Sequence, residues 1–216
     1  MKTKNFLIRL VFGVVLAWTT GLHAQAQTTA LQGWSDGISF NWGDSTGYTF
    51  GWQFQVKQNI EVNSLGVDDL GSIDDSGSST SRQVAIWSDS GVLLTEATVT
   101  LSSQASGTFA WATLDTPLDL SVGTYRIGAY YSGPATDTFI YQATSVTTAP
   151  EITYLDSAAT GGASLSFPNY TDWYPNSYFG PNFQYTTVPE PSVLALAGLG
   201  GLALAAWRRQ RGPDGR

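Results

Sequence analysis

Apolar residues occupy every second position in many short segments between residues 27 and 188. The clearest run is Phe50, Trp52, Phe54 and Val56, which alternate with glycine and glutamine. Similar runs follow at 84–87, 97–101, 109–113 and 125–131, and weaker ones at 152–154 and 183–185. A period of two is typical of strands, and turn residues separate the runs. The pattern therefore predicts an all-β domain at residues 27–187, an antiparallel β-sandwich or jelly roll.

A second pattern, at residues 1–26, is typical of an export signal. Basic residues precede an apolar run at 10–18 that is too short to span a bilayer. Ala24 and Ala26 then form a small-x-small cleavage site, so we expect Gln27 to begin the exported form. A retained N-terminal anchor is the alternative.

Hydrophobic residues dominate again at 192–207. As a helix this segment would rise about 24 Å, slightly less than the ~30 Å hydrocarbon core, so it predicts a short transmembrane helix. Basic side chains follow it at once and would hold this end in the cytoplasm; they are Arg208, Arg209 and Arg211. The segment is preceded by Val188, Pro189, Glu190 and Pro191, and the prolines indicate a joint.

The tail at residues 188–216 resembles the PEP-CTERM sorting signal of Gram-negative bacteria, because a Pro-Glu-Pro motif, a short span and an arginine cluster follow in that order. The resemblance implies processing by an exosortase and transient anchoring in the inner membrane. It also implies export to the cell surface or extracellular matrix, in association with exopolysaccharide or biofilm. An ordinary C-terminal membrane anchor is the alternative.

The body has a looser resemblance, over residues 50–131, to a β-sandwich domain of unknown function found in secreted bacterial proteins. The matching features are a strand–turn–strand at residues 86–95, Thr116-Pro117, Gly123-Thr124-Tyr125 and the strand around Tyr130. The resemblance implies no catalytic residues.

Charge and composition exclude several classes of function. Residues 27–188 contain three basic and fifteen acidic residues, a net charge of −12, which argues against nucleic acid and anionic lipid as partners. The chain has no cysteine, and its one histidine, His23, lies in the predicted signal peptide. Thiol chemistry, a Ser-His-Asp triad and a histidine-bound zinc are therefore excluded from the predicted exported form.

Four aspartates at residues 68–75 are the candidate metal ligands: Asp68, Asp69, Asp74 and Asp75. Calcium prefers several oxygen ligands, and a flexible acidic loop would supply them. Two interpretations stay open, a structural calcium site and a solvated hairpin tip. We expect no other cofactor.

Aromatic residues concentrate at 167–179, and the candidates for glycan binding are Tyr170, Trp173, Tyr174 and Tyr178. Aromatic rings stack on the C–H face of sugars, but they also supply large buried area to a core. The sequence leaves both roles open.

These observations favour an exported, non-catalytic surface or matrix protein. A carbohydrate-binding module that uses the aromatic residues at 167–179 is the alternative. A glycan-cleaving enzyme is the third hypothesis, because such enzymes need two opposed carboxylates; the glutamates of the body are Glu61, Glu96 and Glu151.

Overall fold

The computed structural model describes residues 26–41, 47–69, 81–100, 108–132, 138–171, 174–188, 199–204 and 206–207. Within these residues thirteen strands form antiparallel pairs. The strands are β1 (Thr28–Thr29), β2 (Leu31–Ser35), β3 (Ile38–Asn41), β4 (Tyr48–Val56), β5 (Ile60–Asp69), β6 (Ser81–Ser88), β7 (Leu93–Thr100), β8 (Thr108–Leu120), β9 (Gly123–Tyr131), β10 (Thr138–Tyr141), β11 (Ser145–Thr148), β12 (Ile152–Gly161) and β13 (Pro181–Thr187).

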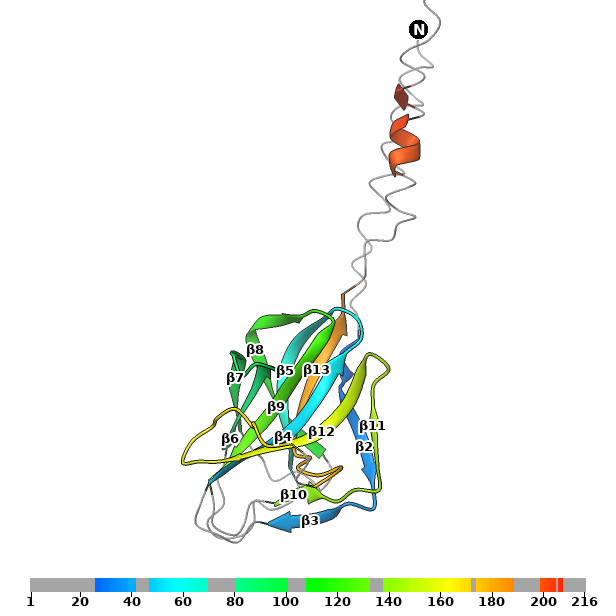
Figure 1. Cartoon of the computed structure of the whole chain (residues 1–216). Coiled ribbons are helices and arrows are strands. Elements are labelled where there is room, and N and C mark those ends of the chain that lie inside the picture. Colours follow the sequence, from blue (N-terminus) through cyan, green and yellow to red (C-terminus); the bar gives the residue numbers. More distant parts are fainter. Residues whose placement is uncertain are drawn as a thin grey trace, which may run out of the picture.

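Two larger sheets pack as a sandwich (Figure 1), which confirms the predicted fold class. One has the strand order β1-β13-β5-β8, and the other has the order β12-β4-β9-β6-β7. The alternating apolar residues of β4 are at most 2% exposed, because they point between the sheets. Trp52 and Phe54 contact Phe183 of β13, with ring centroids 6.1 and 4.9 Å apart.

Two small sheets complete the fold. β2 pairs with β11 along one side of the sandwich, and β3 pairs with β10 at its lower end in Figure 1. β1 pairs with β13, and β2, which begins at Leu31, belongs to another sheet. Asn182 of β13 holds the chain in place at this change of sheet. Its buried amide accepts a hydrogen bond from Leu31 N (2.9 Å) and donates one to Leu31 O (2.8 Å).

Residues 162–171, which we name the strap, cross the outer face of the five-stranded sheet. Side chains alternate along a strand, so Ala85 and Trp87 point to the face of β6 opposite its core-facing residues. Both are nevertheless at most 4% exposed. The strap explains this burial: Phe167 packs edge-on against Trp87 at 6.3 Å, and Ser166 N donates to Thr49 Oγ1 (3.0 Å). Both faces of the sheet are therefore covered beneath the strap.

Two predicted segments, the acidic loop at residues 68–75 and the transmembrane helix at residues 192–207, are described in part. Asp68 and Asp69 were expected in a flexible acidic loop, but they end β5, and Asp68 is buried. In the predicted transmembrane segment, residues 199–204 and 206–207 are helical. Among the residues with described positions, no helix is both long enough and apolar enough to cross a membrane.

The contact between β4 and β9 predicts a sharp difference between two glycines. A Cβ added at Gly51 would lie 1.8 Å from the backbone oxygen of Ile127, whereas one added at Gly33 would meet nothing within 4 Å. We expect Gly51→Ala to lower the free energy of unfolding by about 3 kcal/mol and Gly33→Ala by no more than about 0.5 kcal/mol. Denaturant unfolding of both full-length variants measures this, and equal stabilities would contradict the register of β4 against β9.

Candidate functional site

Four tyrosines gather where β10 meets the segment before β13, and we name them the tyrosine cluster: Tyr48, Tyr141, Tyr174 and Tyr178. The rings of Tyr141 and Tyr174 meet edge to face with centroids 4.8 Å apart. Tyr178 lies 6.4 Å from Tyr141 and stacks on Phe50 at 4.7 Å. Phe50 also stacks on Tyr48 at 5.2 Å, so the cluster is continuous with the core.

Hydrogen bonds hold the backbone around this cluster in place. Ile140 and Phe179 exchange two backbone hydrogen bonds, of 2.8 and 3.2 Å. Ala143 N donates to Asn176 O (2.9 Å), and Gln142 N donates to the hydroxyl of the buried Ser177 (2.9 Å). Ser157 of β12 donates its hydroxyl to the carbonyl of Tyr174. The segment at residues 174–179 is thus tied to both β10 and β12.

Backbone strain concentrates in the same region. The non-glycine residues with positive φ among those described are Asp36, Gln142, Asn176 and Tyr178, at 55°, 52°, 51° and 63°. Asp36 lies between β2 and β3, and Gln142 follows β10 on the way to β11. Both residues therefore lie where the chain passes between the β2-β11 sheet and the β3-β10 sheet. Asn adopts this conformation readily, but for a bulky residue such as Tyr178 it is an outlier that costs about 1–3 kcal/mol.

The predicted glycan-binding residues differ in their accessibility. Tyr170 is 57% exposed, and its backbone pairs with Ala159 at the edge of β12. Tyr174 is partly exposed. Tyr178 is only 1% exposed, so its ring cannot stack on a sugar, and its assignment as a contact residue is corrected. Trp173 lies outside the described residues. Tyr141, which the sequence analysis missed, joins the cluster through pairing of β10 with β3.

The structure describes only part of the predicted metal site. Asp74 and Asp75 lie outside the described residues, and Asp68 and Asp69 occupy consecutive positions in β5. In the described part of the chain, no group of three or more metal-binding side chains occurs. Calcium binding by this segment stays a prediction.

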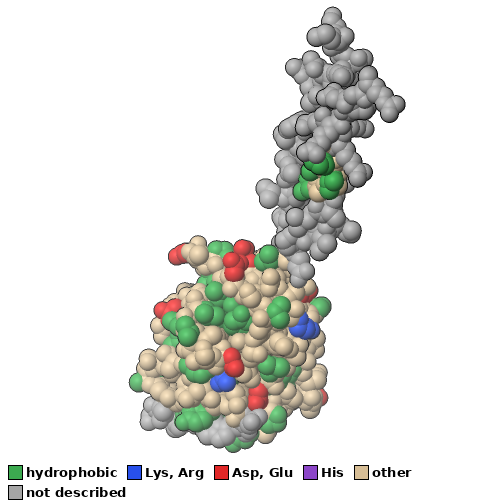
Figure 2. Space-filling model, turned by 45° about the horizontal axis from the view of Figure 1, so that its top comes forward, with side chains coloured by type: hydrophobic (Ala, Val, Ile, Leu, Met, Phe, Trp, Pro, Cys, Tyr) green, Lys and Arg blue, Asp and Glu red, His purple; other side chains and the backbone are tan. Residues whose placement is uncertain are grey.

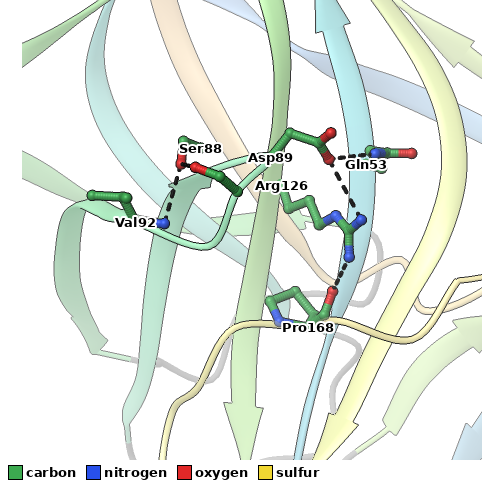
Figure 3. Close-up of polar contacts among 7 residues, drawn as sticks. Gln53, Ser88, Asp89, Val92, Arg126 and Pro168 are labelled. Atoms are coloured by element: carbon green, nitrogen blue, oxygen red, sulfur yellow. Dashed lines mark hydrogen bonds and ion pairs between the residues drawn. The ribbon is translucent and has the colours of Figure 1, made fainter.

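A polar network joins the strap to the five-stranded sheet (Figure 3). Asp89 Oδ1 accepts a hydrogen bond from Gln53 Nε2 (2.7 Å) and lies 3.4 Å from Arg126 Nη2. Arg126 Nη1 donates to the carbonyl of Pro168 (2.7 Å), and its guanidinium lies over the ring of Phe167 at 4.8 Å. An ion pair with a half-exposed partner contributes at most about 1 kcal/mol. The contacts of Arg126 with residues 167 and 168 therefore indicate that it fastens the strap.

The three glutamates considered for a glycan-cleaving enzyme all lie in the described part of the chain. Glu151 Oε2 accepts a hydrogen bond from the hydroxyl of Tyr185 (2.7 Å), and Glu61 Oε1 accepts one from the side-chain amide of Asn63 (2.9 Å). Glu96 lines a depression of about 180 Å³ on β6 and β7 with Gln83, Ala97 and Thr98. On the face shown in Figure 2, the described acidic and basic side chains are scattered among neutral ones.

Around the two ends of the body, three residues of the predicted processing sites are described. Ala26 and Gln27 are exposed. Val188 follows β13 directly, is 39% exposed, and donates its backbone N–H to Asn59 O (3.0 Å). Outside the described residues lie Ala24, Pro189, Glu190, Pro191, Arg208, Arg209 and Arg211.

Comparison with known proteins gives two matches. Residues 37–180 match the family described as a domain of unknown function, DUF4082. Residues 187–210 match the PEP-CTERM protein-sorting motif. No curated protein matches the chain. The first match spans the sandwich from the turn before β3 to the end of the tyrosine cluster, and the second begins at the last residue of β13.

Burial of the tyrosines predicts how stability depends on alkaline pH. Burial and a side-chain hydrogen bond with Tyr174 raise the pKa of Tyr141 to about 12, and burial raises the pKa of Tyr154 to about 12. Burial also raises the pKa values of Tyr178 and Tyr185. Unfolded tyrosines ionise near pH 10, so the unfolded state loses protons first. The stabilisation is complete below about pH 10 and is lost as pH rises through about 12.

Tyrosinate absorbance and far-ultraviolet circular dichroism, followed together against pH, measure this. We expect several of the ten tyrosines to ionise only near pH 12 or when the fold is lost. Tyr141→Phe should remove one tyrosine from this late class. A single class that titrates near pH 10 with the β-structure intact would contradict the burial described here.

Proposed function

Because the chain belongs to the DUF4082 family and ends in a PEP-CTERM sorting motif, we propose that it is a non-catalytic protein of the cell surface, held in the extracellular polysaccharide matrix. The sorting motif implies an exported protein that an exosortase processes in a Gram-negative bacterium. The C-terminal segment then anchors the chain in the inner membrane only until processing.

The observation that carries this proposal is the position of the sorting motif relative to the fold. The motif begins at Thr187, the last residue of β13, and Val188 makes the last backbone hydrogen bond described for the body. The prolines that follow favour extended backbone. Extended backbone is what a protease or transpeptidase binds, because a helix uses its amides in internal hydrogen bonds. Cleavage after the body would therefore leave the sandwich intact.

A non-catalytic role is supported by what the charged side chains do. Asp89 and Arg126 fasten the strap, and Glu151 binds the buried Tyr185. The exported body contains neither histidine nor cysteine once the predicted signal peptide is removed. A general base or nucleophile would have to come from carboxylates or hydroxyls. Most of these groups that have described partners are bonded to other residues of the body.

Mass spectrometry of the C-terminus, on protein isolated from the surface of its native host, tests the sorting model. We expect the surface form to end before the hydrophobic segment and to lack residues 192–216. A variant with Pro189→Ala and Pro191→Ala should keep the tail and stay in the membrane fraction, because the extended joint is lost. An intact Arg208-Arg209 on the wild-type surface form would contradict the model.

A further inference from the structure

We propose that Tyr170 and the exposed side of the tyrosine cluster bind a neutral polysaccharide chain, with the side-chain amides of Gln142 and Asn176 as hydrogen-bonding partners. This deepens the proposed function, since it names the component of the matrix that the domain contacts. Compared with the site predicted from the sequence, the proposed site no longer includes Tyr178 as a contact residue. It adds Tyr141 of β10 and Gln142, which follows β10.

Tyr170 and Tyr174 are both attached through their backbones to β12. Tyr170 pairs with Ala159 through two backbone hydrogen bonds of 2.9 Å, and the carbonyl of Tyr174 accepts a hydrogen bond from Ser157. Their anchor points are two residues apart on β12, about 7 Å along the strand. A tyrosine offers an apolar face and a polar tip, as a sugar does.

Amide groups supply the second element of recognition. Gln142 follows Tyr141 directly and is exposed, and Asn176 is partly exposed two residues after Tyr174. An amide both donates and accepts hydrogen bonds, so it matches neighbouring sugar hydroxyls, which do the same. The positive φ of both residues is fixed by the bonds from Gln142 N to Ser177 and from Ala143 N to Asn176 O.

The third element is that core packing fixes the backbone beneath the exposed rings. Tyr178 is held between Phe50 and Phe139, with ring centroids at 4.7 and 5.6 Å, despite its strained backbone. Such strain persists only where the surroundings fix it, and it concentrates at functional sites. A rigid platform loses little conformational entropy on binding. Tyr178 is thus a positioning residue beneath the exposed rings.

Charge selects the class of polysaccharide. The body carries a net charge of −12, and its basic residues are Lys57, Arg82 and Arg126. Arg126 is engaged by the strap, and Arg82 is buried over the ring of Tyr131. An anionic chain would be repelled, whereas a neutral chain of pyranose rings meets no such barrier.

Affinity electrophoresis of the full-length chain in detergent tests the proposal, with separate gels that contain hydroxyethyl cellulose, dextran, galactomannan or the anionic polygalacturonate. We expect at least one neutral polymer to retard the wild-type chain and polygalacturonate not to. Tyr170→Ala should weaken the retardation roughly tenfold, because the ring is lost while its backbone hydrogen bonds remain. The matched control is Tyr125→Ala, at the opposite end of β4 from the cluster.

A second variant separates binding from folding. Asn176→Gly removes the amide but accepts the positive φ of 51°, so the melting temperature should not fall. We expect about fivefold weaker retardation, the effect of one lost hydrogen bond. Three outcomes would each overturn the proposal: retardation by no neutral polymer, retardation by polygalacturonate alone, or equal losses in Tyr170→Ala and Tyr125→Ala. None of them bears on C-terminal processing, so the sorting model stands or fails separately.

Discussion

The aromatic rings packed between the two large sheets are the interaction on which the rest of the structure depends. The chain has no cysteine, so no disulfide joins the sheets. Instead, Trp52 packs against Phe183 and donates its indole N–H to the carbonyl of Pro181 (2.8 Å). This contact combines a large buried area with a satisfied buried donor. It also fixes β13 relative to β4, and so fixes the segment that leads into β13.

That arrangement explains why the tyrosine cluster and the sorting motif lie at the two ends of one strand. Residues 174–180, which include Tyr174 and Tyr178 of the cluster, directly precede β13. Val188, in the sorting motif, directly follows it. The pairing of β13 with β5 sets the direction of the strand between them. The segment that the sorting motif presents to an exosortase therefore lies at the opposite end of β13 from the tyrosine cluster. The topology therefore separates processing from the proposed binding surface.

Period two was enough to predict the strands that are regular. Residues 50–56 became β4 because their apolar side chains all point to the core, and residues 125–131 lie in β9. β5 was not predicted, because a register shift between Val62 and Ser64 breaks its alternation. The small sheets were missed as well, since strands of four or five residues are too short to show a period.

The accessibility of the aromatic residues could not be read from the sequence. Tyr170 and Tyr178 occur in the same aromatic segment, yet one is 57% exposed and the other 1%. The difference arises because Phe179 pairs with Ile140, a contact between residues 39 positions apart that draws Tyr178 beneath Phe139. Tyr141 was missed for the same reason, since only this pairing brings it to Tyr174.

The most direct test of this account is hydroxyl-radical footprinting of the surface-located protein on intact cells of its native host. Labelling is compared before and after removal of the extracellular polysaccharide, with Tyr125 as the internal control. The account predicts that Tyr170 and Tyr174 become labelled only after the polysaccharide is removed, while Tyr178 stays unlabelled and Tyr125 does not change. Equal labelling of Tyr170 and Tyr174 in both states would contradict it.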